Sequence, residues 1–117
     1  MDLVVTVPLS FGLDSWIAEG DAAGDPDSGQ LWGFSIGGAS PDVTTGDRVY
    51  VVCNGRLRGY APLVRLEWNT TRHRGELIRG GGAVAVTVDF RIPGFRGWRY
   101  RWWPRDQERP FPDWRVP

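Results

Sequence analysis

The sequence predicts a mainly β protein (α+β) with one short helix near its start, folded as a small, partly closed β-barrel of five or six strands. Three observations carry this prediction: short β-branched runs recur along the chain, glycine- and proline-rich turns separate them, and one stretch has helical spacing of its apolar residues. The length of 117 residues suits one domain that buries about two-thirds of its unfolded surface. We therefore expect residues 1–117 to form a single domain.

The chain is predicted to begin with a strand and a short helix. Residues 3–7 form a β-branched run that Pro8 stops. Apolar residues at helical spacing follow, with Ser10 or Asp14 as N-cap candidates and Gly20 placed to end the helix.

An acidic segment then leads to the second predicted strand. Residues 21–29, DAAGDPDSG, have the composition of a surface loop and lack the closing glutamate of a calcium-binding loop. Residues 30–36 resume an extended pattern, and turn residues follow them.

The next two strands are predicted to form a hairpin. Residues 48–53 are strongly β-branched and end at Asn54-Gly55, the strongest short hairpin signal, because both central residues of a type I′ turn need positive φ. Residues 57–68 return as the partner strand. A two-residue turn does not bring apolar residues onto the same face in both strands, so we expect a bulge near Gly59 or a longer loop.

The second half is predicted to hold a long loop and a further strand. Residues 69–82 are polar and end in three glycines, which favours a loop. Over residues 83–90 larger apolar residues alternate with small or polar ones, and this pattern predicts a strand. The residues expected to point inward are Val84, Val86, Val88 and Phe90, and those expected to point outward are Ala85, Thr87 and Asp89.

Residues 94–105, GFRGWRYRWWPR, alternate arginine with aromatic residues and are predicted to form the last strand. The residues expected on one face are Trp98, Tyr100 and Trp102, and those on the other are Arg99, Arg101 and Trp103. Exposed guanidinium groups beside rings suit a nucleotide or nucleic-acid strand. An alternative is that the arginines cover apolar surface and pair with the chain's own carboxylates.

The end of the chain, residues 104–117, contains four prolines and cannot continue as a helix. We expect this proline-rich segment to wrap over the barrel with Phe111 and Trp114 as anchors.

Charge and composition restrict the function classes. The net charge is zero, but residues 1–50 carry a net charge of −7 (one arginine, eight acids) and residues 51–117 a net charge of +7 (thirteen arginines, six acids). The chain has no lysine, which excludes Schiff-base and lysine-base chemistry. The single cysteine, Cys53, and the single histidine, His73, cannot form a four-ligand zinc site. We expect Cys53 to be a buried, inert thiol, and we predict no catalytic residues, metal or cofactor.

The same composition suggests where the protein works. A lone cysteine favours a reducing compartment, and no segment has the apolar length of a signal peptide or a spanning helix. We expect a cytoplasmic protein without a membrane partner.

The segment TGDRVYVVCNGRLRGYAPLVRLEW, residues 45–68, resembles the central hairpin of the PUA-like barrels, in particular the ASCH, EVE and YTH group. In that group a glycine-aspartate pair starts a strand, and a small-residue strand returns from the turn. The order of the surrounding elements is also similar, so the resemblance spans most of residues 3–103.

This resemblance implies a cleft between the end of the first strand and the barrel, used for RNA, nucleotides or modified bases. EVE and YTH members often hold a modified base between aromatic rings. By position, Ser10 resembles the polar group after the first strand, and Trp32 and Trp68 resemble the rings of the cage. Burial in the core is the competing role for each tryptophan.

Five arginines are candidates for contacts with a phosphate backbone, and they are Arg72, Arg74, Arg79, Arg99 and Arg101. The first three fall in the predicted loop, where a solvated loop without a ligand is the competing role.

Three functions stay open at this point. The first is a module that binds nucleic acid or a nucleotide, either RNA or modified DNA. The second is a hydrolase of modified nucleosides, although the lysine-dependent site of some ASCH members has no counterpart here. The third is a protein-interaction domain that uses its tryptophans and arginines.

Overall fold

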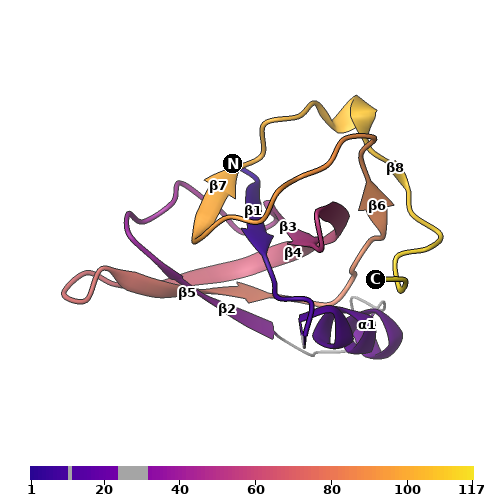
Figure 1. Cartoon of the computed structure of the whole chain (residues 1–117). Coiled ribbons are helices and arrows are strands. Elements are labelled where there is room, and N and C mark those ends of the chain that lie inside the picture. The colour runs from indigo at the N-terminus through magenta and orange to yellow at the C-terminus, as the bar shows by residue number, and fades with distance from the viewer. Residues whose placement is uncertain (11, 24–31) are drawn as a thin grey trace.

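Six strands form one curled, half-closed barrel sheet in the order β2-β5-β4-β3-β1-β7 (Figure 1). The computed structural model describes residues 1–10, 12–23 and 32–117, and the side chains of residues 1–10, 12–18 and 33–117. The strands of this sheet are β1 (Leu3–Thr6), β2 (Trp32–Gly37), β3 (Arg48–Cys53), β4 (Arg56–Asn69), β5 (Arg74–Arg79) and β7 (Trp98–Tyr100). Only β1 and β3 run parallel within this sheet. The predicted fold class, mainly β with one short helix, is confirmed for the described residues.

The helix α1 (Gly12–Ala23) lies at one end of the barrel (Figure 1). The prediction that Gly20 ends the helix is wrong, because the helix continues through it to Ala23. A glycine inside a helix costs about 1 kcal/mol relative to alanine, and the two alanines that follow are the strongest helix formers. The rest of the predicted acidic loop, residues 24–29, lies outside the described residues.

The hairpin of β3 and β4 is confirmed, including its irregularity. Asn54 and Gly55 have φ values of 54° and 76°, as a type I′ turn requires. Val51 pairs with Gly59, but Val52 pairs with Leu57, so Arg58 is an extra residue in β4. This is the predicted bulge, and it places the Arg58 side chain inside the protein, where it is fully buried.

The prediction of a loop over residues 69–82 is wrong. β4 continues to Asn69, a turn follows, and β5 then lies between β4 and β2 in the sheet. Only two apolar residues, Leu77 and Ile78, mark this strand, and both are buried. Pairing on both sides satisfies its backbone groups, an effect of tertiary structure that outweighs its polar, glycine-flanked composition.

The predicted strand over residues 83–90 is much shorter in the structure. Only β6 (Val86–Thr87) forms, paired with β8 (Arg109–Pro110). The predicted faces are partly wrong: Phe90 is 39% exposed instead of inward, and Thr87 is buried instead of outward. Val84, also expected inward, is 40% exposed and makes a single bridge to Tyr60. The partner segment is proline-rich, so it offers too few N–H donors to extend the ladder.

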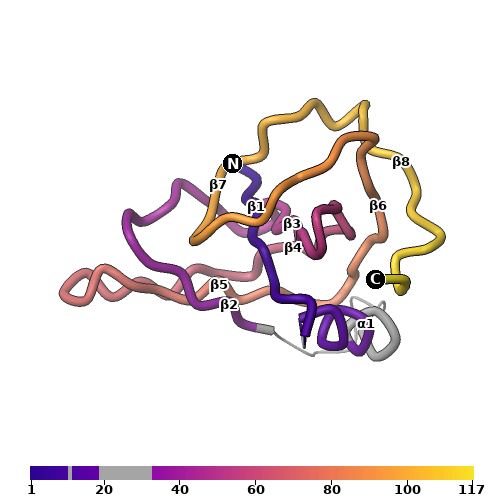
Figure 2. Tube along the Cα trace, in the orientation of Figure 1, coloured from indigo at the N-terminus to yellow at the C-terminus, as the bar shows by residue number. Residues whose placement is uncertain are grey.

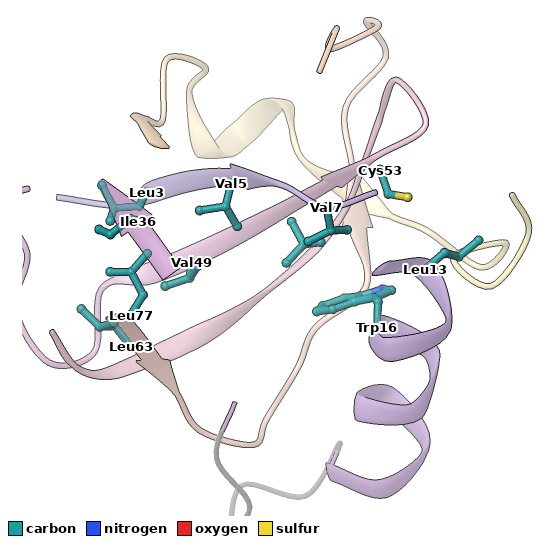
Figure 3. Packing of buried hydrophobic residues seen from close by; sticks show 11 residues of the cluster. Leu3, Val5, Val7, Leu13, Trp16, Ile36, Val49, Cys53, Leu63 and Leu77 are labelled. Carbon is teal, nitrogen blue, oxygen red and sulfur yellow. The ribbon is translucent and has the colours of Figure 1, made fainter. Parts of the chain in front are cut away.

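The central strands β1 and β3 are buried on both faces. Alternate residues of these strands enter two separate cores. Figure 3 shows the first core, where Trp16 of α1 faces the sheet near Val7 and Leu13. The second core lies on the opposite face and is closed by Val88, Ile92 and Trp103 from the later part of the chain. Burial on both faces explains why these strands have almost no polar residues.

The C-terminal segment passes over the barrel, and the tube in Figure 2 shows it returning toward α1. Phe111 is buried, and the Trp114 ring meets the Trp16 ring edge-on at 6.3 Å between centroids. The only helical part of this segment is a three-residue 3₁₀ turn, η2 (Arg105–Gln107). The buried Arg58 guanidinium donates hydrogen bonds to the carbonyls of Trp114 and Val116, so the bulge in β4 also fixes the end of the wrap.

Candidate functional site

A cleft of 530 Å³ opens where β1 ends, bounded by α1, β2 and β3. Its apolar walls include the side chains of Val7, Trp16, Phe34 and Val51. Three polar residues, Thr6, Ser15 and Ser35, also border it. The volume and the mixture of apolar walls with a few polar residues are typical of sites for small ligands.

The guanidinium group of one arginine lies close to both aromatic rings of the cleft, Trp16 and Phe34. The Arg79 guanidinium carbon lies 4.8 Å from the centroid of the Phe34 ring and 5.6 Å from that of the Trp16 ring. Arg79 is fully buried. Contacts of a desolvated guanidinium with aromatic rings are worth about 2 kcal/mol or more, so they favour the observed orientation of both rings. The rings therefore form a preorganised wall.

The sequence-predicted cage residues do not meet in this cleft. Ser10 is exposed in the turn between β1 and α1 and does not line it. Trp68 lines a separate, open hollow of 380 Å³, where its ring lies over Gly75 of the neighbouring strand. Trp32 belongs to β2, but its side chain lies outside the described part of the chain. Ser35 borders both hollows, so they adjoin on β2.

The three arginines of the predicted loop are separated by β5. Arg72 is exposed at the hairpin turn, and Arg74 lines the Trp68 hollow together with Glu67 and Glu76. Arg79 lies at the other end of β5 inside the barrel, so its guanidinium has no surface for a phosphate. A common phosphate cradle from these arginines is therefore not formed.

The predicted arginine–aromatic strand is shorter than expected, since β7 ends at Tyr100. Trp98 and Tyr100 share a face as predicted, with ring centroids 4.8 Å apart. Trp102 leaves that face and is 48% exposed, whereas Trp103 enters the second core. Arg99 is exposed with its guanidinium over the Phe95 ring.

Arg101 is not available to a ligand in the way the alternation predicted. Its Nε donates a hydrogen bond of 3.1 Å to Asp2, whose carboxylate also accepts from Arg105 Nη2 at 2.8 Å and from the Arg48 backbone N–H at 2.9 Å. Burial acts to raise the pKa of Asp2, but these hydrogen bonds outweigh it and hold the pKa below its ordinary value. Arg101 therefore has a structural partner, as the alternative interpretation of this run allowed.

The single thiol and the single histidine lie in different environments. Cys53 is fully buried in β3, which confirms the predicted burial, and this burial raises the pKa of its thiol. His73 is exposed in the β4–β5 turn with φ 50°. Within residues 1–10, 12–23 and 32–117, no three metal-ligating side chains gather at one point.

Sequence reasoning missed Trp16 and Phe34 as cleft residues. Signals for both were present. Trp16 has helical spacing with Leu13 and Ile17, which aims it at the sheet, and Phe34 alternates with Ile36, which aims it at the core face of β2. The distance between the helix and β2 cannot be predicted from the sequence. This distance determines that the two rings lie beside a cleft.

None of the helices in the described part of the chain has the length and apolar composition that a membrane crossing requires. Comparison with protein-family models, with curated proteins and with solved structures finds no match to this chain.

Proposed function

We propose that this protein is a nucleic-acid or nucleotide binding module that holds a base in the cleft at the end of β1. The observation that carries the proposal is that two aromatic residues, Trp16 and Phe34, and polar residues such as Ser15 line one cleft. A base needs both features, because its faces stack on rings and its edge forms hydrogen bonds.

The location of the cleft supports the proposal as well. It lies between the end of the first strand and the barrel, where the resemblance to PUA-like domains leads us to expect a ligand. Membership of that superfamily, with an ASCH-like or EVE-like domain, remains part of the proposal. The cytoplasmic location is also part of the proposal, and the single, buried cysteine supports it.

A nucleoside titration tests the proposal. Isothermal titration calorimetry of the full chain with a panel of unmodified, alkylated and acylated nucleosides is expected to show binding of at least one of them. Phe34→Leu keeps apolar volume against the core but removes the stacking face. We expect it to weaken binding by roughly 10-fold, since stacking of a base on a ring is worth about 1–3 kcal/mol.

Trp68→Ala is the matched control, because it removes a ring from the neighbouring hollow instead of the cleft. We expect this variant to bind like the wild type. Loss of binding in Trp68→Ala with retention in Phe34→Leu would move the base to the Trp68 hollow. If the wild type binds no nucleoside at millimolar concentration, the proposal fails. Release of product from an acylated or alkylated nucleoside would instead favour the hydrolase.

A further inference from the structure

A surface that we name the arginine–aromatic strip lies outside the cleft. Its members are exposed or half-buried side chains of the segment that crosses from β6 to β7 and continues past it, namely Phe90, Arg91, Phe95, Arg96, Arg99 and Trp102. Residues 90–105 contain five arginines and no acidic residue. Two of these arginines bind Asp2, but among the described residues Arg91, Arg96 and Arg99 form no ion pair.

The rings of the strip form a connected series. The centroid of Phe90 lies 6.1 Å from that of the buried Trp103, which lies 4.9 Å from that of Trp102. Trp102 in turn lies 6.4 Å from Phe95, and the Arg99 guanidinium stands 4.5 Å from the Phe95 ring centroid. Because Trp103 supports its neighbours from the second core, the exposed ring of Trp102 is held in place at the surface.

Each end of the strip meets a distinct feature. At the Phe90 end lies a hollow of 350 Å³ lined by three arginines, Arg56, Arg91 and Arg109, against one carboxylate, Asp89. Asp89 pairs with Arg109 at 2.5 Å, so the hollow keeps a net positive charge. At the other end the Phe95 backbone N–H donates a hydrogen bond of 3.4 Å to the Thr6 hydroxyl, and Thr6 lines the cleft. The strip therefore extends from a cationic hollow to Thr6, a residue of β1 that borders the cleft.

We propose that the arginine–aromatic strip binds a single-stranded nucleic acid, with bases stacked on Trp102 and Phe90 and phosphates at Arg91, Arg96 and Arg99. Alternating rings and planar cations suit a strand whose base faces are free, whereas a duplex hides those faces. The inference rests on the proposed function for one feature, the base that enters the cleft beside Thr6. An unpaired base enters such a cleft at a lower cost than a base in a duplex.

Charge favours this ligand over a protein. Tryptophan and arginine also dominate protein interfaces. The strip and its hollow, however, combine five exposed arginines with a single carboxylate, and this imbalance matches a polyanion. A protein partner is an alternative that the following test separates.

Fluorescence anisotropy of labelled 12-nucleotide oligouridine and oligothymidine with the full chain, over a range of NaCl concentrations, tests the proposal. We expect the single strands to bind and the matching duplexes to bind at least about 10-fold more weakly. Trp102→Ala is expected to weaken binding by roughly 10-fold. The double variant Arg96→Gln/Arg99→Gln should reduce the slope of log K against log[NaCl] by about 1.4, since each phosphate contact with a single strand contributes about 0.7.

Two control variants separate the possible failures. Arg72→Gln removes an exposed arginine at the β4–β5 turn and should leave the slope unchanged. Phe34→Leu should weaken nucleoside binding but also leave the slope unchanged. Equal affinity for duplex and single strand would overturn the proposal, as would a slope that depends on Arg72 and not on the strip. Nucleoside binding without oligonucleotide binding would refute the strip alone and point to a protein partner for it. Strip-dependent oligonucleotide binding without nucleoside binding would refute only the cleft.

Discussion

Gly59→Ala is expected to destabilise the protein by roughly 3 kcal/mol or more, a large part of the about 5–15 kcal/mol that stabilises a typical domain. Gly59 has φ 151°, a conformation that residues with a side chain rarely adopt. A Cβ atom at this position would lie 2.3 Å from the Val84 carbonyl oxygen and 2.7 Å from the Trp16 ring. Both neighbours are fixed, the first by its hydrogen bond from Tyr60 N and the second by the core.

Urea denaturation followed by circular dichroism measures this effect. Gly97→Ala is the matched control, because Gly97 also has positive φ, 74°, but a Cβ there meets no atom within 4 Å. The control should lose only about 1 kcal/mol, the cost of the backbone conformation. Equal losses in the two variants would show that the close approach of Val84 and Trp16 contributes nothing. A fully stable Gly59→Ala would contradict the bulge itself.

The bulge illustrates what the sequence makes predictable. The Asn54-Gly55 turn and the β-branched run before it determine the register of the hairpin locally, and the apolar pattern of β4 then requires one extra residue. All of this information lies within about twenty consecutive residues. Phe111 and Trp114, the two anchors of the C-terminal segment, could also be predicted locally, because they are the only aromatic residues in this proline-rich stretch.

The errors share one cause, which is pairing between segments distant in the sequence. β5 has only two apolar residues, yet it is a strand because β2 and β4 supply partners on both sides. The alternation over residues 83–90 predicted a full strand, but its partner β8 is two residues long and lies more than twenty residues later. Neither the partners of β5 nor the short length of β8 can be predicted from local composition.

The sequence predicted which types of residue form the candidate site, but not which individual residues do so. The sequence predicted aromatic rings near the end of the first strand together with surface arginines. The curvature of the sheet then decides which rings meet: Trp16 and Phe34 share the cleft, whereas Trp68 turns toward Gly75 on the adjoining hollow. Likewise Arg101 continues the arginine–aromatic alternation of the sequence just past the end of β7, but it binds the buried carboxylate of Asp2, 99 residues earlier.

Asp2→Asn is expected to destabilise the protein by about 2 kcal/mol at pH 7, because two partly exposed guanidinium groups would lose charge-assisted hydrogen bonds to the buried carboxylate. Only 4% of the Asp2 side chain is exposed, and its oxygens accept three hydrogen bonds that join the first residues to β3 and to the segment after β7. Asparagine keeps the shape and one acceptor, so the loss reports charge more than packing.

The effect of this substitution should depend on pH in a defined direction. The folded-state pKa of Asp2 lies below its unfolded value of about 3.9, so its contribution is complete above that value and is lost as the pH falls through the folded pKa. The difference in free energy of unfolding between wild type and Asp2→Asn should therefore be largest near neutral pH and shrink below about pH 4. Urea denaturation at pH 7, 5, 3.5 and 2.5 measures it.

Glu67→Gln provides the comparison for an exposed carboxylate. Glu67 pairs with Arg65 at 2.8 Å, but the two side chains are 53% and 51% exposed, so this pair should contribute less than about 1 kcal/mol at any pH. A penalty for Asp2→Asn that stays constant from pH 7 to 2.5 would mean that the amide disturbs packing and that the charge of Asp2 is not what holds Arg101 and Arg105. A penalty that vanishes in acid would show that this carboxylate ties the start of the chain to the segment that leads from the arginine–aromatic strip into the C-terminal wrap.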